Sequence, residues 1–229
     1  MPGLDPRLLI ERLRTAASLP QAVAVTIVGA ALYGAGLGAW HGPRMALYAA
    51  VKLPMVLLVT GAATLLFNVL ATAVLGERLR PRVAARLTAS ALASAAGLLG
   101  SLAPVAVLLA VTTPPPSPAA RLDHNLLYLL HTGLVGACGL VDTAALWRSL
   151  SAACRSRRGA RVVFATWIGS LALVGGEVAW ALRPFLGSVY EEVAFVRRDA
   201  LDGNVYEFVW SDILPYLTGR DSGQESDDE

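Results

Sequence analysis

Five long runs of apolar residues dominate the hydrophobic pattern of the chain, and polar or proline-containing segments separate them. The runs cover about residues 21–40, 45–74, 87–112, 125–147 and 161–182. Each run reaches or exceeds the roughly 20 residues that an α-helix needs to cross the hydrocarbon core of a bilayer. The pattern therefore predicts an all-α integral membrane protein, with a bundle of five transmembrane helices over residues 21–183.

The segments that flank the apolar runs predict short amphipathic helices at the membrane surface. In the leader, residues 1–20, leucines and charged residues separate onto opposite sides of a possible helix, although an ordinary solvated leader fits as well. The tail, residues 184–219, is rich in Tyr, Phe and Trp, which indicates either an interfacial cap over the bundle or an element that docks a partner. Residues 220–229 are polar and acidic, and we expect them to be disordered.

Composition indicates a membrane protein, and the placement of arginines predicts its orientation in the membrane. The chain is 55% hydrophobic and 16% charged, whereas soluble domains carry roughly 25% charged residues. Arginines gather in the leader and in the loops after the second and fourth runs, while the alternate loops hold only Arg44 and Arg121. The positive-inside rule then predicts a cytoplasmic N-terminus and an external C-terminus. The bias toward Ala, Arg, Gly and Leu is compatible with a GC-rich bacterial genome, so we expect the bacterial inner (cytoplasmic) membrane.

Prolines, small residues and cysteines bear on how the helices pack. Pro54 and Pro104 lie inside the second and third runs, and we expect them to kink these helices rather than end them. Small residues recur at helical spacing in the first, third and fourth runs. They predict contacts inside the bundle, with a dimer face as the alternative. The small residues concerned are Ala30, Gly34 and Gly38; Ser90, Ser94, Gly97 and Ser101; and Gly133, Gly136, Gly139 and Thr143.

Cys154 lies beside arginines and could be acylated, although a plain reduced thiol is favoured.

Ionisable residues interrupt three of the apolar runs at a similar predicted depth. Lys52, which is the only lysine in the chain, His131 and Glu177 each lie about 10 Å inside the external boundary, at 1.5 Å per helical residue. Because a charge inside a bilayer needs a partner, we expect one polar cluster with an ion pair between Lys52 and Glu177. Arg183 is the rival partner of Glu177, but it lies about 120° away around the helix.

A second polar layer is predicted deeper in the bundle, at Asn68 and Asp142. His131, Cys138 and Asp142 share one helix face, and Asp142 lies about 16 Å beyond His131 along the axis. Two interpretations stay open. The polar residues could line a path for protons, ions or a small polar solute. Alternatively, they could be buried groups that fix the register of the helices.

The sequence offers no signal for enzymatic chemistry. It contains none of the HExxH, GxSxG or P-loop patterns, and one histidine and one cysteine on a helix face do not make a metal site. We therefore expect no catalytic residues, no metal and no cofactor. Trp40, Trp180, Arg183 and Trp210 have the residue types that anchor helix ends at a membrane interface.

The segments "YAAVKLP", "TPPP", "AWALRPFLG" and "FVRRDALDGNVYEFV" together resemble a group of uncharacterised bacterial multispan membrane proteins. That group resembles Yip1-like proteins in having about five spans and a lysine–proline step in one of them. The resemblance implies a role in membrane organisation or partner recruitment.

Two functions follow from the sequence. The first is a non-enzymatic membrane scaffold or accessory subunit, whose partners are the lipid bilayer and a protein that binds the tail or the arginine-rich loops. The second is a small transporter or channel that uses Lys52, His131 and Glu177. Neither function calls for nucleic acid, and either allows an oligomer.

Overall fold

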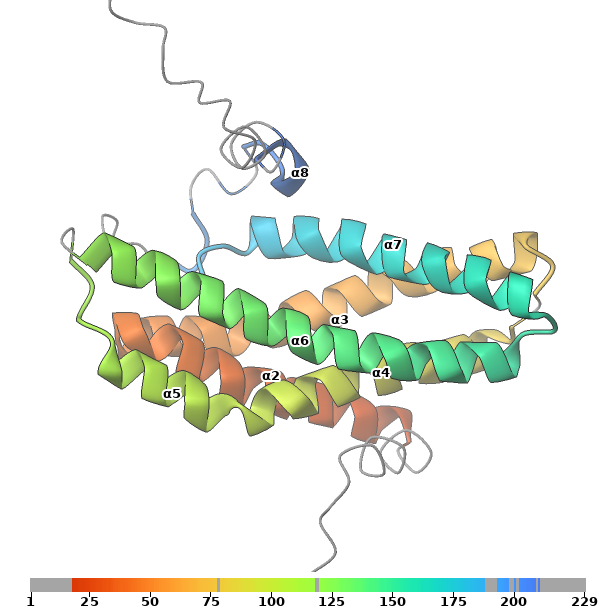
Figure 1. Cartoon of the computed structure of the whole chain (residues 1–229), viewed down its shortest axis with the longest axis horizontal. Helices are drawn as coiled ribbons and strands as arrows, with labels where there is room; N and C mark the ends of the chain where they lie inside the picture. The colour runs from red at the N-terminus through yellow and green to blue at the C-terminus, as the bar shows by residue number, and fades with distance from the viewer. Residues whose placement is uncertain are drawn as a thin grey trace, which may run out of the picture.

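The computed structural model describes residues 18–77, 79–117, 120–187, 193–197, 200, 202–208 and 210. The predictions for residues 1–17 of the leader, for residues 211–219 of the tail and for residues 220–229 lie outside this part of the chain. The described segments form an all-α bundle whose long helices run side by side along the longest axis of the molecule (Figure 1). The helices are α2 (Leu19–Gly38), α3 (Pro43–Val74), α4 (Pro81–Ser101), α5 (Ala103–Thr112), α6 (Arg121–Ala153), α7 (Arg157–Ala181) and α8 (Val205–Phe208), with a short 3₁₀ turn, η1 (Ala39–His41), after α2.

Five of these helices are long and apolar enough to cross a membrane: α2 with η1, α3, α4, α6 and α7. The predicted fold class, an all-α membrane bundle, is confirmed. The third apolar run is divided into α4 and α5 at Leu102, two residues before Pro104. Pro54, in contrast, stays inside the continuous helix α3.

Glycine and proline set the sharp turn between α2 and α3. Gly42 has φ of 117°, in the region that favours a residue without a Cβ. Pro43 follows at the first position of α3, where its missing N–H is not needed. The turn therefore returns the chain directly against α2.

Small residues bring α2 close to its neighbours; Gly34 was among those predicted for contacts inside the bundle, whereas Gly29 and Gly100 were not. A Cβ on Gly29 would overlap the carbonyl group of Ala96 in α4, and a Cβ on Gly34 would overlap that of Ala49 in α3. Gly100 faces Gly29 across the same α2–α4 contact. Such approaches let backbones pack where lipid supplies no hydrophobic drive.

The same prediction is wrong for α6. A Cβ at any of its three glycines, Gly133, Gly136 and Gly139, would meet no atom within 4 Å among the described residues. Large side chains on this helix are also exposed, for example Leu129 at 67% and Leu140 at 73%. Helical spacing places small residues on a common stripe, but it does not say whether a neighbouring helix or the bilayer lies against that stripe.

Candidate functional site: a plug at one end of the bundle

The two ends of the bundle differ in how the chain closes them. At the end that we call the tail end, α2, α5 and α7 finish and α3 and α6 begin; it lies at the left of Figure 1. The opposite end, which we call the arginine end, carries the connections α3–α4 and α6–α7. After α7, residues 184–187 turn back into the tail end, and we call this segment the plug.

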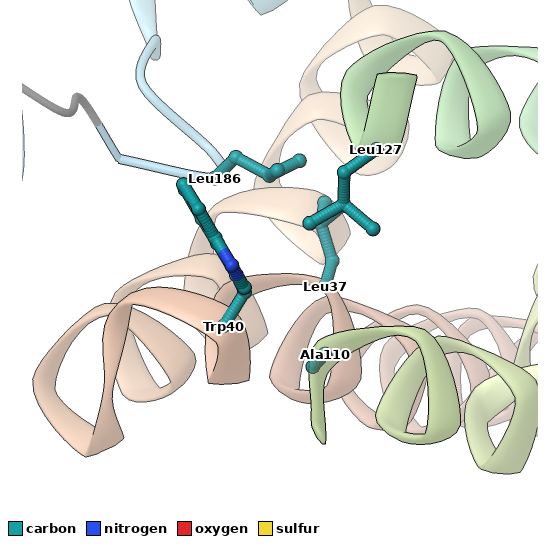
Figure 2. Close-up of a cluster of buried hydrophobic side chains, with 5 residues drawn as sticks. All are labelled: Leu37, Trp40, Ala110, Leu127 and Leu186. Carbon is teal, nitrogen blue, oxygen red and sulfur yellow. The ribbon is translucent and has the colours of Figure 1, made fainter. Parts of the chain in front are cut away.

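Leu186 is the hydrophobic centre of the plug. It is 3% exposed and belongs to one buried cluster with Leu37 of α2, Trp40 of η1, Ala110 of α5 and Leu127 of α6 (Figure 2). The plug thus joins a cluster built from α2, η1, α5 and α6, all of which precede it in the sequence. The plug is consequently part of the hydrophobic core at this end of the bundle.

Polar contacts hold the last residue of the plug. The φ of Gly187 is 90°, and a Cβ there would overlap the ring of His41, so glycine suits both its conformation and its space. The carbonyl of Gly187 accepts a hydrogen bond from Nε2 of His124 at 3.2 Å. The His124 ring in turn lies 5.4 Å from the ring of Trp40, measured between centroids.

Lys52 fastens the plug to α3. Its side chain is fully buried, and its Nζ donates a hydrogen bond of 2.6 Å to the carbonyl of Pro184. The ammonium also faces two aromatic rings, that of Phe185 at 5.8 Å and that of Phe195 in the tail at 5.2 Å. A carbonyl dipole and two ring faces thereby stabilise a charge that lies inside the bundle.

The predicted ion pair between Lys52 and Glu177 is not formed. Lys52 bonds to the Pro184 carbonyl, and Oε1 of Glu177 is buried with no hydrogen-bond partner among the described residues. Glu177 instead borders a cavity with Asn204 and Tyr206 of the tail. Equal depth along two helices does not fix the direction in which each side chain points around its axis, and the prediction considered only side-chain partners.

His131 also lies apart from Lys52. Its Nδ1 is 2.9 Å from the hydroxyl of Tyr33, and the two rings meet edge to face. Both side chains are nearly inaccessible, and Cys138 packs in the same cluster as Tyr33. The predicted three-residue cluster is thus divided among three places: Lys52 under the plug, His131 against α2, and Glu177 near the tail.

The second polar layer is present in part. Oδ1 of Asn68 accepts a hydrogen bond of 2.8 Å from the hydroxyl of Ser170, which joins α3 to α7. Asp142 is 8% exposed on α6. Thr64 and Thr72, both fully buried beside Asn68 on α3, donate to carbonyls of their own helix. The threonines are therefore satisfied within α3, whereas Asn68 bonds to α7 and its Nδ2 is buried with no hydrogen-bond partner among the described residues.

The four predicted interfacial anchors have different surroundings. Trp40 is 5% exposed, and its Nε1 donates a hydrogen bond of 2.7 Å to the carbonyl of Pro114. Arg183 lies with its guanidinium 3.6 Å above the ring of Trp180, and it donates to the Trp180 carbonyl. Trp210, in contrast, is 75% exposed. Trp40 is thus a core residue at the tail end, whereas Trp210 offers a free aromatic surface.

The tail docks on α7 through Tyr206. Its hydroxyl lies 2.7 Å from the carbonyl of Leu173 and 3.1 Å from that of Ala172. A Cβ on Gly176 would come within 2.9 Å of this hydroxyl, so glycine permits the close approach. Burial, and secondarily the nearby Glu177 carboxylate, raise the pKa of Tyr206.

Sequence reasoning missed Glu77, which joins the two connections at the arginine end. Its carboxylate accepts hydrogen bonds from the backbone N–H of Arg155 at 2.7 Å and from the Ser156 hydroxyl at 3.3 Å. Glu77 is 7% exposed although it lies in a connection rich in arginine. A lone acidic residue among arginines was the available signal. Burial, and secondarily Glu77, raise the pKa of Cys154, which disfavours the thiolate and supports the reduced thiol.

Comparisons with protein families, with curated proteins and with solved structures each find no match to this chain. The resemblance to Yip1-like proteins therefore stays a prediction.

Proposed function

We propose that this chain is a non-enzymatic membrane scaffold or accessory subunit, which holds its tail at the membrane surface for a protein partner. The observation that carries the proposal is the contact between Lys52 and the Pro184 carbonyl, because it uses the buried charge to fasten the chain that leads into the tail. A charge that conducts or binds a solute needs access to water, whereas Lys52 is 0% exposed. A structural role for Lys52 thus fits better than transport.

The fixed position of the tail supports partner recruitment. Phe195 lies against Lys52 and packs edge to face on Tyr48 of α3, with 5.2 Å between ring centroids. Tyr206 bonds to carbonyls of α7. Both contacts hold tail residues on the bundle and leave Trp210 exposed. Aromatic residues held on a rigid support are frequent energetic centres of protein interfaces.

Site-directed photo-crosslinking in the native membrane tests the proposal. A photoreactive phenylalanine analogue in place of Trp210 should give a discrete protein adduct of constant mass. The same analogue in place of Leu140, which is exposed at 73% on α6, is the matched control and should give lipid adducts only. The proposal fails if both positions give lipid adducts alone, or if both give the same protein adduct.

We also propose the bacterial inner membrane as the location, with a cytoplasmic N-terminus and an external C-terminus. The arginine-rich connections at one end of the bundle support this orientation through the positive-inside rule. After Arg158, a reporter that works only in the cytoplasm should be active. After Gly219, a reporter that works only outside the cytoplasm should be active. The orientation is wrong if both fusions report the same side.

A further inference from the structure

A cavity of about 360 Å³ lies beside the plug, between α6, α7 and the tail. Its volume is within the range of about 300–1,000 Å³ that is typical of small-molecule sites. The side chains that matter for its chemistry are Arg183, Arg197, Trp180, Tyr128, Phe185 and His124. They come from α6, from the end of α7, from the plug and from the tail, so the cavity exists only while the tail end is assembled.

The charged residues of this cavity are both basic. Arg183 and Arg197 line it, and none of the described residues that line it is acidic. The guanidinium of Arg183 is held in place, since it lies 3.6 Å over the Trp180 ring and donates to the Trp180 carbonyl. Two guanidinium groups around one cavity favour an anion between them. His124 forms part of the wall, and its Nε2 donates a hydrogen bond to the carbonyl of Gly187 in the plug.

The remaining walls are aromatic and lie where α7 ends. Trp180, Tyr128 and Phe185 surround the guanidinium groups with apolar surface. Arg and aromatic residues at the end of a membrane-spanning helix are placed at the depth of the lipid headgroups. An anion with an apolar or glycerol-like extension fits this combination better than a bare metal ion or a cationic solute.

We propose that this cavity binds a phosphate group, carried either by an anionic lipid headgroup or by a soluble phosphate compound. The guanidinium groups of Arg183 and Arg197 pair with the phosphate oxygens, and the aromatic walls pack against the glycerol or acyl part. This binding site does not depend on the proposed scaffold function, because it concerns a small ligand and not a protein partner.

Native mass spectrometry of the full-length protein in an uncharged detergent tests the proposal. The probes are phosphatidylglycerol, phosphatidylcholine and inorganic phosphate. We expect saturable binding of phosphatidylglycerol that is roughly tenfold or more weakened by R183Q or R197Q, because each variant removes one charged pair. R44Q is the matched control: Arg44 also lies at the tail end, where its Nε bonds to Tyr48, and it does not line the cavity.

The three probes distinguish the source of the phosphate. Binding of phosphatidylglycerol alone assigns a lipid headgroup. Binding of inorganic phosphate that R197Q removes assigns a soluble phosphate compound. If R183Q does not fold, R197Q carries the test, because Arg197 lies outside the plug and the arginine stacked on Trp180 is Arg183. The proposal is overturned if no probe binds, if R197Q binds as tightly as the wild type, or if R44Q weakens binding as much as R197Q.

Discussion

Replacing Leu186 with alanine should release the plug from the tail end of the bundle. The side chain is 3% exposed and lies in a buried cluster with residues of α2, η1, α5 and α6 (Figure 2). Leu→Ala substitutions at buried sites cost about 2–5 kcal/mol, since they remove buried surface and leave a cavity. These contacts exist only while the plug is packed in the bundle. Most of this free-energy cost should therefore shift the equilibrium between packed and released plug toward the released state.

The expected change in the population of the released plug follows from that free energy. About 1.4 kcal/mol corresponds to a factor of ten in an equilibrium constant, so a loss of about 2 kcal/mol raises the released population by roughly 30-fold. Amide hydrogen exchange over residues 185–187, the plug residues that carry an N–H, reports this population, because exchange proceeds through local opening. L186A should therefore speed exchange of this segment by at least roughly 30-fold in a neutral detergent.

The matched control for L186A is L129A on α6, since Leu129 is 67% exposed and lies outside the cluster around Leu186. L129A should leave exchange of residues 185–187 unchanged. Exchange in L186A that equals the wild-type rate, or that L129A reproduces, would refute the account of the plug as part of the core.

Two further predictions concern helix packing and the arginine end. G34A should lower the melting temperature, because its Cβ would overlap the Ala49 carbonyl and overpacking typically costs about 1–3 kcal/mol. G136A should leave the melting temperature unchanged or raise it, since its Cβ meets open space and alanine favours a helix by up to about 1 kcal/mol; equal losses in both variants would contradict this packing. In a C138S background, E77Q should shift the pH dependence of Cys154 alkylation to lower pH, because removal of the carboxylate lowers the raised pKa of the thiol. An unchanged midpoint in the pH–rate profile would show that Glu77 does not act on Cys154.

The membrane fold could be predicted from the sequence because bilayer thickness sets the length of a spanning helix. The five apolar runs therefore correspond to the helices of the bundle. The close approach of Gly34 to α3 was also predictable from its spacing with other small residues. The identical argument for Gly136 was wrong, since only the fold determines which stripe of α6 faces a neighbour.

The surroundings of Lys52 could be predicted only in part. Its burial and its need for a partner followed from a lone lysine inside an apolar run. Its partner is a backbone carbonyl of the plug, which depends on how the chain turns after α7. Hydropathy does not encode that turn. Every residue has a backbone carbonyl, so the sequence does not show which carbonyl accepts the bond. A carboxylate partner such as Glu177, in contrast, can be recognised by its residue type.

Flux across liposomes tests most directly whether Lys52 is structural or part of a path. The purified full-length protein is reconstituted in sealed vesicles, and the movement of protons and of small ions is followed with internal dyes. We predict that the wild type and K52M both leak no faster than protein-free vesicles, because the fully buried Lys52 bonds to the plug and is not part of a solute path. A wild-type flux that saturates with solute concentration and that K52M abolishes would contradict it.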